Sequence, residues 1–142
     1  MSKNTPSHCL SMQLFVGVMV AILLDSLWIG FVAKHLYLQA FSSFMLSPEM
    51  MRPAQWIAAI GVWFIMVVGI VHFVLPKTIK ASLRDAAIEG GLYGLVVYGS
   101  YGLTNYAVFK NWPFHIVFTE LLWGTAFCAV ITIVLTLFSR TK

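Results

Sequence analysis

Residues 11–33 read SMQLFVGVMVAILLDSLWIGFVA, and this stretch decides the class of fold. It holds 23 residues with a single charged side chain, Asp25. An α-helix rises about 1.5 Å per residue, so about 20 apolar residues cross the roughly 30 Å hydrocarbon core of a bilayer. The stretch therefore predicts a transmembrane helix.

Three further stretches have the same character, at about residues 53–75, 86–108 and 113–138. Each contains at most one acidic residue, and Pro53, Pro76 and Pro113 stand at their ends, where a missing N–H does least harm. Apart from the first, the loops between them are short, which makes consecutive helices antiparallel neighbours. We predict an all-α, integral membrane four-helix transmembrane bundle that forms a single domain over residues 1–142.

The composition supports a membrane protein and excludes several other classes. Sixty per cent of the residues are hydrophobic and 10% are charged, whereas a soluble domain has roughly 45–50% and 25%. The formal net charge of +4 comes from basic residues scattered singly among apolar runs, without a basic patch. We therefore expect the lipid bilayer as partner and no nucleic acid.

The distribution of basic residues predicts the orientation, because cytoplasmic loops carry an excess of Lys and Arg. Six basic residues fall on the side of the termini and the second loop, and three fall on the other side. The six are Lys3, Lys77, Lys80, Arg84, Arg140 and Lys142, and the three are Lys34, Arg52 and Lys110. Both termini should face the cytoplasm, in a multi-pass protein of the inner (cytoplasmic) membrane.

The first loop, residues 34–52, is apolar for a loop. Leu36, Tyr37, Ala40 and Phe41 recur at helical spacing. Two interpretations stay open: an amphipathic helix lying in the outer interface, and an irregular loop on top of the bundle.

Two carboxyl groups, Asp25 and Glu120, lie deep within the apolar stretches, where a charge costs about 2.5–3.5 kcal/mol on insertion scales, whereas Glu89 lies near the inner end of the third stretch. Trp28 and Trp123 follow them by three residues, a spacing that puts acid and indole on one helix face. Measured from each segment's midpoint, Asp25 lies about 5 Å and Glu120 roughly 8 Å towards the outer side. The two acids are therefore expected at similar depth.

The third stretch carries a stripe of glycine, tyrosine and amide residues at spacings of three and four, and its polar end belongs to the same outer half. Trp63 of the second stretch lies near the midplane. Together these residues predict a buried acid and aromatic binding site. Its candidate members are Asp25, Trp28, Trp63, Tyr98, Tyr101, Asn105, Glu120 and Trp123.

Each of these features also has a structural interpretation. Polar side chains between transmembrane helices often serve packing alone, at about 0.6 kcal/mol each. Gly90 and Gly94 form a close-packing signal, which we assign to packing within the bundle before dimerisation. No pair of histidines has the spacing of a metal site and no cofactor or nucleophile motif is present, so we predict no metal and no cofactor.

Several motifs in order resemble a family of small bacterial membrane proteins, domain of unknown function 2177. They are LDSLWIG at residues 24–30, Tyr37, GLVVYGSYGLTNYA at 94–107, Trp112-Pro113 and ELLWG at 120–124. The resemblance implies a four-helix membrane protein and no known activity. The family usually has Asp at the positions of Gly102 and Glu120. Glu120 is still an acid, so this chain has one acid fewer than the family pattern.

Three functions remain open for such a protein. The first is binding or transport of a small solute or cation at Asp25 and Glu120, because aromatic faces attract organic cations and buried carboxyl groups can exchange a proton for a cation. The second is a structural or partner subunit, as a homo-oligomer or with another membrane protein. The third is a membrane-embedded enzyme acting on an apolar substrate, with the two acids as general acid and base.

Overall fold

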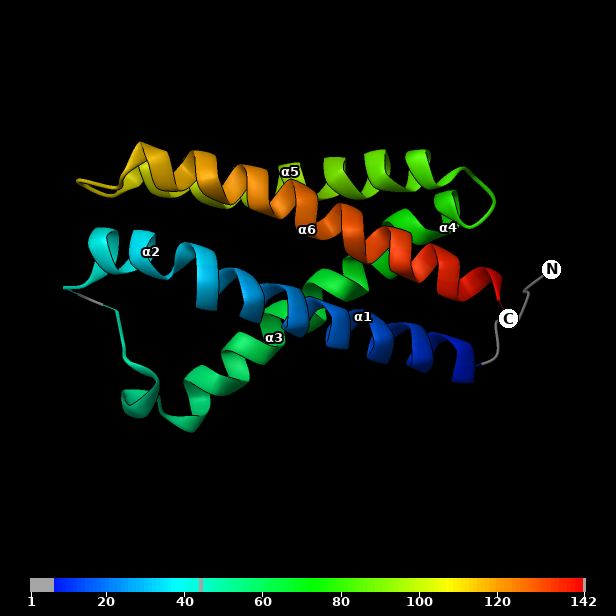
Figure 1. Ribbon diagram of the computed structural model, residues 1–142, viewed down its shortest axis with the longest axis horizontal. Helices are drawn as coiled ribbons and strands as arrows, with labels where there is room; N and C mark the ends of the chain where they lie inside the picture. Colours follow the sequence, from blue (N-terminus) through cyan, green and yellow to red (C-terminus); the bar gives the residue numbers. More distant parts are fainter. Residues whose placement is uncertain (1–6, 44, 142) are drawn as a thin grey trace.

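The computed structural model describes residues 7–43 and 45–141 of the chain (Figure 1). Within these residues the regular structure is all helical. The elements are α1 (Ser7–Leu27), η1 (Trp28–Ala33), α2 (Lys34–Phe41), η2 (Pro48–Met50), α3 (Pro53–Gly69), η3 (Ile70–Val74), α4 (Leu75–Thr78), α5 (Leu83–Val108) and α6 (Phe114–Arg140). η1 and η3 are π-helical turns, and η2 is a single 3₁₀ turn. The predicted all-α class is confirmed.

Three helical segments are long and apolar enough to cross a membrane: Cys9–Phe41, Pro53–Thr78 and Phe114–Arg140. The prediction of four transmembrane helices is therefore confirmed for three. α5 has 26 residues, about 39 Å of helix, but it does not reach the same apolarity. Its five glycines, four tyrosines and Asn105 lower its mean hydropathy.

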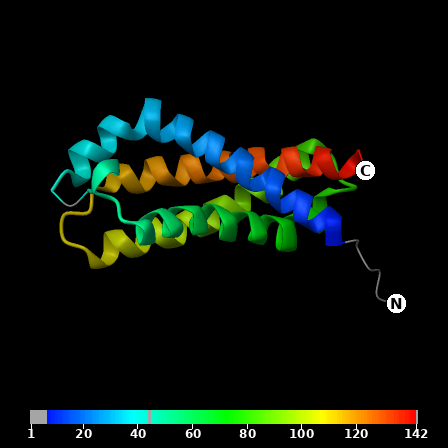
Figure 2. The same cartoon turned by 90° about the horizontal axis from the view of Figure 1, so that it is seen from below.

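The first helix ends eight residues later than the sequence predicted, at Phe41 instead of Ala33. Residues 34–41 contain neither glycine nor proline, so nothing interrupts the backbone hydrogen bonds after the π turn η1. Figure 2 shows that the helix bends there and that α2 continues from α1. Whether α2 lies in the interface remains a prediction.

α5 and α6 form the most extensive helix pair of the chain and run antiparallel, side by side (Figure 1). Glycines on α5 permit this close approach. A methyl group at Gly94 would press on the backbone of Gly124, and one at Gly90 would press on Thr132 and on the carbonyl oxygen of Cys128. Small residues allow transmembrane backbones to approach in this way.

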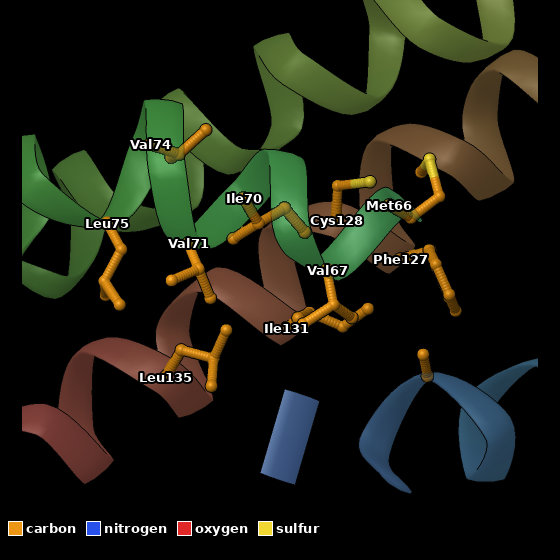
Figure 3. Close-up of a cluster of buried hydrophobic side chains, with 11 residues drawn as sticks. Met66, Val67, Ile70, Val71, Val74, Leu75, Phe127, Cys128, Ile131 and Leu135 are labelled. Carbon is orange, nitrogen blue, oxygen red and sulfur yellow. The ribbon is translucent and has the colours of Figure 1, made fainter. Parts of the chain in front are cut away.

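The main apolar core fills one half of the bundle, where η3 and α4 pack on α6 (Figure 3). Ile70, Phe127, Ile131 and Leu135 are almost completely buried there. α1 begins and α6 ends in this half, and the turn before α5 also lies there (Figures 1 and 2). We call it the inner half, after the sequence prediction that these ends face the cytoplasm. The outer half lies towards the connections 42–52 and 109–113.

Polar contacts close the inner end of the bundle. The Arg140 guanidinium donates hydrogen bonds to the carbonyl oxygens of Thr78, the last residue of α4, and of Ile79 and Ala81, which follow it. Ser82 caps α5 by accepting from the backbone N–H of Asp85. The Ser82 hydroxyl and backbone N–H donate in return to the Asp85 carboxylate and hold the pKa of that carboxyl below its ordinary value.

Candidate functional site

Asp25 accepts hydrogen bonds from two indoles on two other helices. Nε1 of Trp63 on α3 lies 2.9 Å from Oδ2, and Nε1 of Trp123 on α6 lies 3.1 Å from Oδ1. Indole nitrogens only donate hydrogen bonds, and a carboxylate only accepts them. The two hydrogen bonds tie α1 to both α3 and α6.

Glu120 on α6 accepts a hydrogen bond at Oε1 from the Tyr37 hydroxyl of α2. The π turn η1 explains how Tyr37 comes to face the same side as Asp25. At about 100° per residue, the separation of 12 positions from Asp25 to Tyr37 would leave the two side chains about 120° apart on a regular helix. A π turn absorbs one extra residue, which reduces this angle to about 20°. Both acids thus obtain a donor from another helix.

The two acids line one cavity of about 450 Å³ in the outer half. This volume falls within the range of small-molecule sites. All four long helical segments described above, Cys9–Phe41, Pro53–Thr78, α5 and α6, contribute to its wall. The lining residues are Asp25, Ile29, Tyr37, Val62, Met66, Val97, Tyr98, Tyr101, Glu120 and Trp123.

Five of the eight candidate residues line this cavity: Asp25, Tyr98, Tyr101, Glu120 and Trp123. The other three lie outside the lining. Trp63 does not line the cavity but donates a hydrogen bond to Asp25, which does. Trp28 stacks on Trp123, with ring centroids 4.5 Å apart and planes 3° from parallel.

Three buried donor groups that lie outside the cavity lining have no acceptor in the part of the chain that the structure describes. They are Nε1 of Trp28, Nδ2 of Asn105 and Nε1 of Trp112. The tryptophan that follows each acid by three residues does not donate to that acid among the described residues: Trp123 donates to Asp25 instead of Glu120, and Nε1 of Trp28 has no acceptor.

Sequence reasoning missed half of the wall. Tyr37 was recognised in the motif and in the apolar pattern of the first loop, but it was not assigned to the site. Ile29, Val62, Met66 and Val97 are ordinary apolar residues of transmembrane segments. No sequence signal distinguishes them from lipid-facing residues, because helix rotation decides which of them face the cavity.

The cavity lining contains acidic but no basic side chains among the described residues. It contains two carboxyl groups, three tyrosines and one tryptophan, and no lysine, arginine or histidine from residues 7–43 and 45–141. Among the described residues, no group of three histidine, cysteine or acidic side chains is placed to hold a metal ion. The cavity combines hydrogen-bond acceptors with aromatic faces.

The fold and the cavity define a helical membrane protein with an acidic, aromatic-lined site. The chain belongs to the family described as "Predicted membrane protein (DUF2177)", whose model matches residues 10–137. This match confirms the family predicted from the motifs. No curated protein and no solved structure matches the chain.

Proposed function

We propose that this protein binds a small organic cation in the outer-half cavity. One observation carries the proposal: Asp25 and Glu120, from two different helices, line the same aromatic-walled cavity, and no basic side chain lines it with them. Two carboxylates without a basic partner would repel each other in a low-dielectric setting. A bound cation supplies the missing positive charge.

The walls suit an organic cation better than a bare metal ion. Trp123, Tyr98 and Tyr101 present aromatic rings to the cavity, and a ring face attracts a cation by about 0.5–2 kcal/mol. Hydrogen bonds from Trp63, Trp123 and Tyr37 orient the carboxylates, which leaves lone pairs on both acids for a ligand. An ammonium group would meet acceptors on one side and ring faces on the other.

The inner half favours binding over transport. Transport would require a second opening towards the inner end, where Ile70, Phe127, Ile131 and Leu135 are packed without exposed surface. Packing at this density resists the insertion of even one methylene group. We therefore take binding as the function and transport as a step that would need the core to open.

The proposal includes a fourth membrane crossing by α5. Its glycines pack against α6, whereas the large residues that it exposes, such as Ile88, Leu92, Val96 and Leu103, are mostly apolar. The mean hydropathy along α5 averages these two faces and is therefore lower than that of the apolar face alone. With α5 spanning, the bundle has four antiparallel crossings with both termini in the cytoplasm and lies in the inner membrane.

Tetramethylammonium binding to the protein in phosphatidylcholine nanodiscs tests the proposal, with tryptophan fluorescence as the signal. We expect Asp25→Asn and Glu120→Gln each to weaken binding at least about tenfold, that is by about 1.4 kcal/mol, since each removes one negative charge. Glu49→Gln is the matched control, because Glu49 lies in η2 and outside the cavity lining. Its affinity should equal that of the wild type.

A loss of folded protein would mimic a loss of binding, so each variant is first compared with the wild type by circular dichroism. Trp63→Phe provides a second route, since it keeps both acids and removes one donor to Asp25. It should shift the affinity less than Asp25→Asn does. Unchanged affinity in both folded acid variants would overturn the proposal.

A further inference from the structure

The cavity is bounded on one side by a helix that stands apart. α3 packs mainly on α1, whereas its continuation through η3 and α4 makes the contacts with α5 and α6. No residue of α3 from 53 to 65 is buried. Figures 1 and 2 together show that α3 diverges from α5 towards its beginning at Pro53.

Residues at this divergence line the cavity and are also exposed. Val62 of α3 is 58% exposed, Tyr101 of α5 is 56% exposed and Ile29 of η1 is 45% exposed. The two acids are only partly exposed. The cavity therefore opens sideways between α3 and α5, with an apolar mouth and an acidic interior.

This mouth lies at the depth of the hydrocarbon core. Val62 is nine residues from the start of the membrane-spanning segment Pro53–Thr78, about 14 Å along the helix, and the core is roughly 30 Å thick. The neighbouring surface is apolar, with Ile65 on α3 and Val96 on α5 both exposed. Acyl chains, not water, surround such an opening.

We infer that the ligand is an amphiphilic organic cation, an ammonium group carrying an alkyl chain, with its chain passing through the α3–α5 mouth into the lipid. The inference rests on the proposed function and adds the ligand class to it. The ammonium group lies with Asp25 and Glu120, and the chain lies along Val62 and Ile29. Phospholipid headgroups do not fit, because their phosphate would meet two carboxylates and no basic side chain.

The test compares dodecyltrimethylammonium with tetramethylammonium in phosphatidylcholine nanodiscs, at equilibrium. Val62→Trp narrows the mouth, and Ile57→Trp is its control on the same helix, since Ile57 is 70% exposed and lies outside the lining. Partition of the long-chain probe into the bilayer is the same for all variants and cancels. We expect Val62→Trp to weaken dodecyltrimethylammonium binding at least about tenfold more than it weakens tetramethylammonium binding, and Ile57→Trp to leave the binding of both probes unchanged.

The outcomes separate this inference from the proposed function. If Val62→Trp and Ile57→Trp bind dodecyltrimethylammonium equally and tetramethylammonium binding still depends on Asp25, the alkyl chain does not pass through the α3–α5 mouth, but the proposed cation site stands. If Asp25→Asn leaves tetramethylammonium binding unchanged, both the proposed cation site and the inferred ligand class are refuted. Replacing half of the phosphatidylcholine by phosphatidylethanolamine should not compete. Competition would overturn the exclusion of phospholipid headgroups.

Discussion

Gly94 on α5 offers a sharp test of how the outer-half cavity is held together. In Gly94→Ala the new methyl group would lie against the Gly124 carbonyl oxygen and 2.8 Å from its carbonyl carbon, whereas ordinary contact begins at 3.4 Å. The backbones of α5 and α6 would have to separate by at least about 0.6 Å at this point. Such overpacking costs about 1–3 kcal/mol.

Gly61→Ala on α3 is the matched control, because a methyl group at Gly61 meets no atom within 4 Å. Both variants gain the helix propensity of alanine, about 0.8–1.0 kcal/mol in water-based scales. The difference between the two therefore isolates the overpacking term. Unfolding by sodium dodecyl sulfate in mixed micelles measures it, and we expect Gly94→Ala to be about 1–3 kcal/mol less stable than Gly61→Ala. Equal stability of the two variants would refute the close α5–α6 contact.

Two further predictions concern the inner end and the crossing of α5. Arg140→Ala should lower the free energy of unfolding by about 1 kcal/mol, because the carbonyl oxygens of Thr78, Ile79 and Ala81 lose their donor. The control is Lys80→Ala, an exposed neighbour, which should leave the midpoint of unfolding in mixed micelles unchanged. Equal midpoints for the two variants would contradict a stabilising role of the Arg140 hydrogen bonds. In a background with Cys9→Ser and Cys128→Ala, a membrane-impermeant maleimide should label Lys110→Cys in intact cells and Lys80→Cys only after lysis. Labelling of both in intact cells, or of neither, would mean that α5 does not cross.

The binding site shows where prediction from sequence stops. The two acids were found because a carboxyl group in an apolar stretch stands out on energetic grounds alone. The sequence predicts Trp63 as a member of the site without pairing it with Asp25, and it does not assign Tyr37 to the site, because both reach the acids from other helices. The π turn η1 changes the angular register between Asp25 and Tyr37, and no periodicity argument based on a regular α-helix includes such a turn.

The sequence by itself determined three apolar membrane-spanning segments, the all-helical class and the family. These follow from local properties: the length of an apolar run, the positions of proline, and the order of short motifs. The tertiary structure alone decided that Asp25 and Glu120 share a cavity and that α3 packs mainly on α1, while its continuation contacts α5 and α6. The rotation and tilt of each helix set these relations, and they depend on packing between residues far apart in the chain.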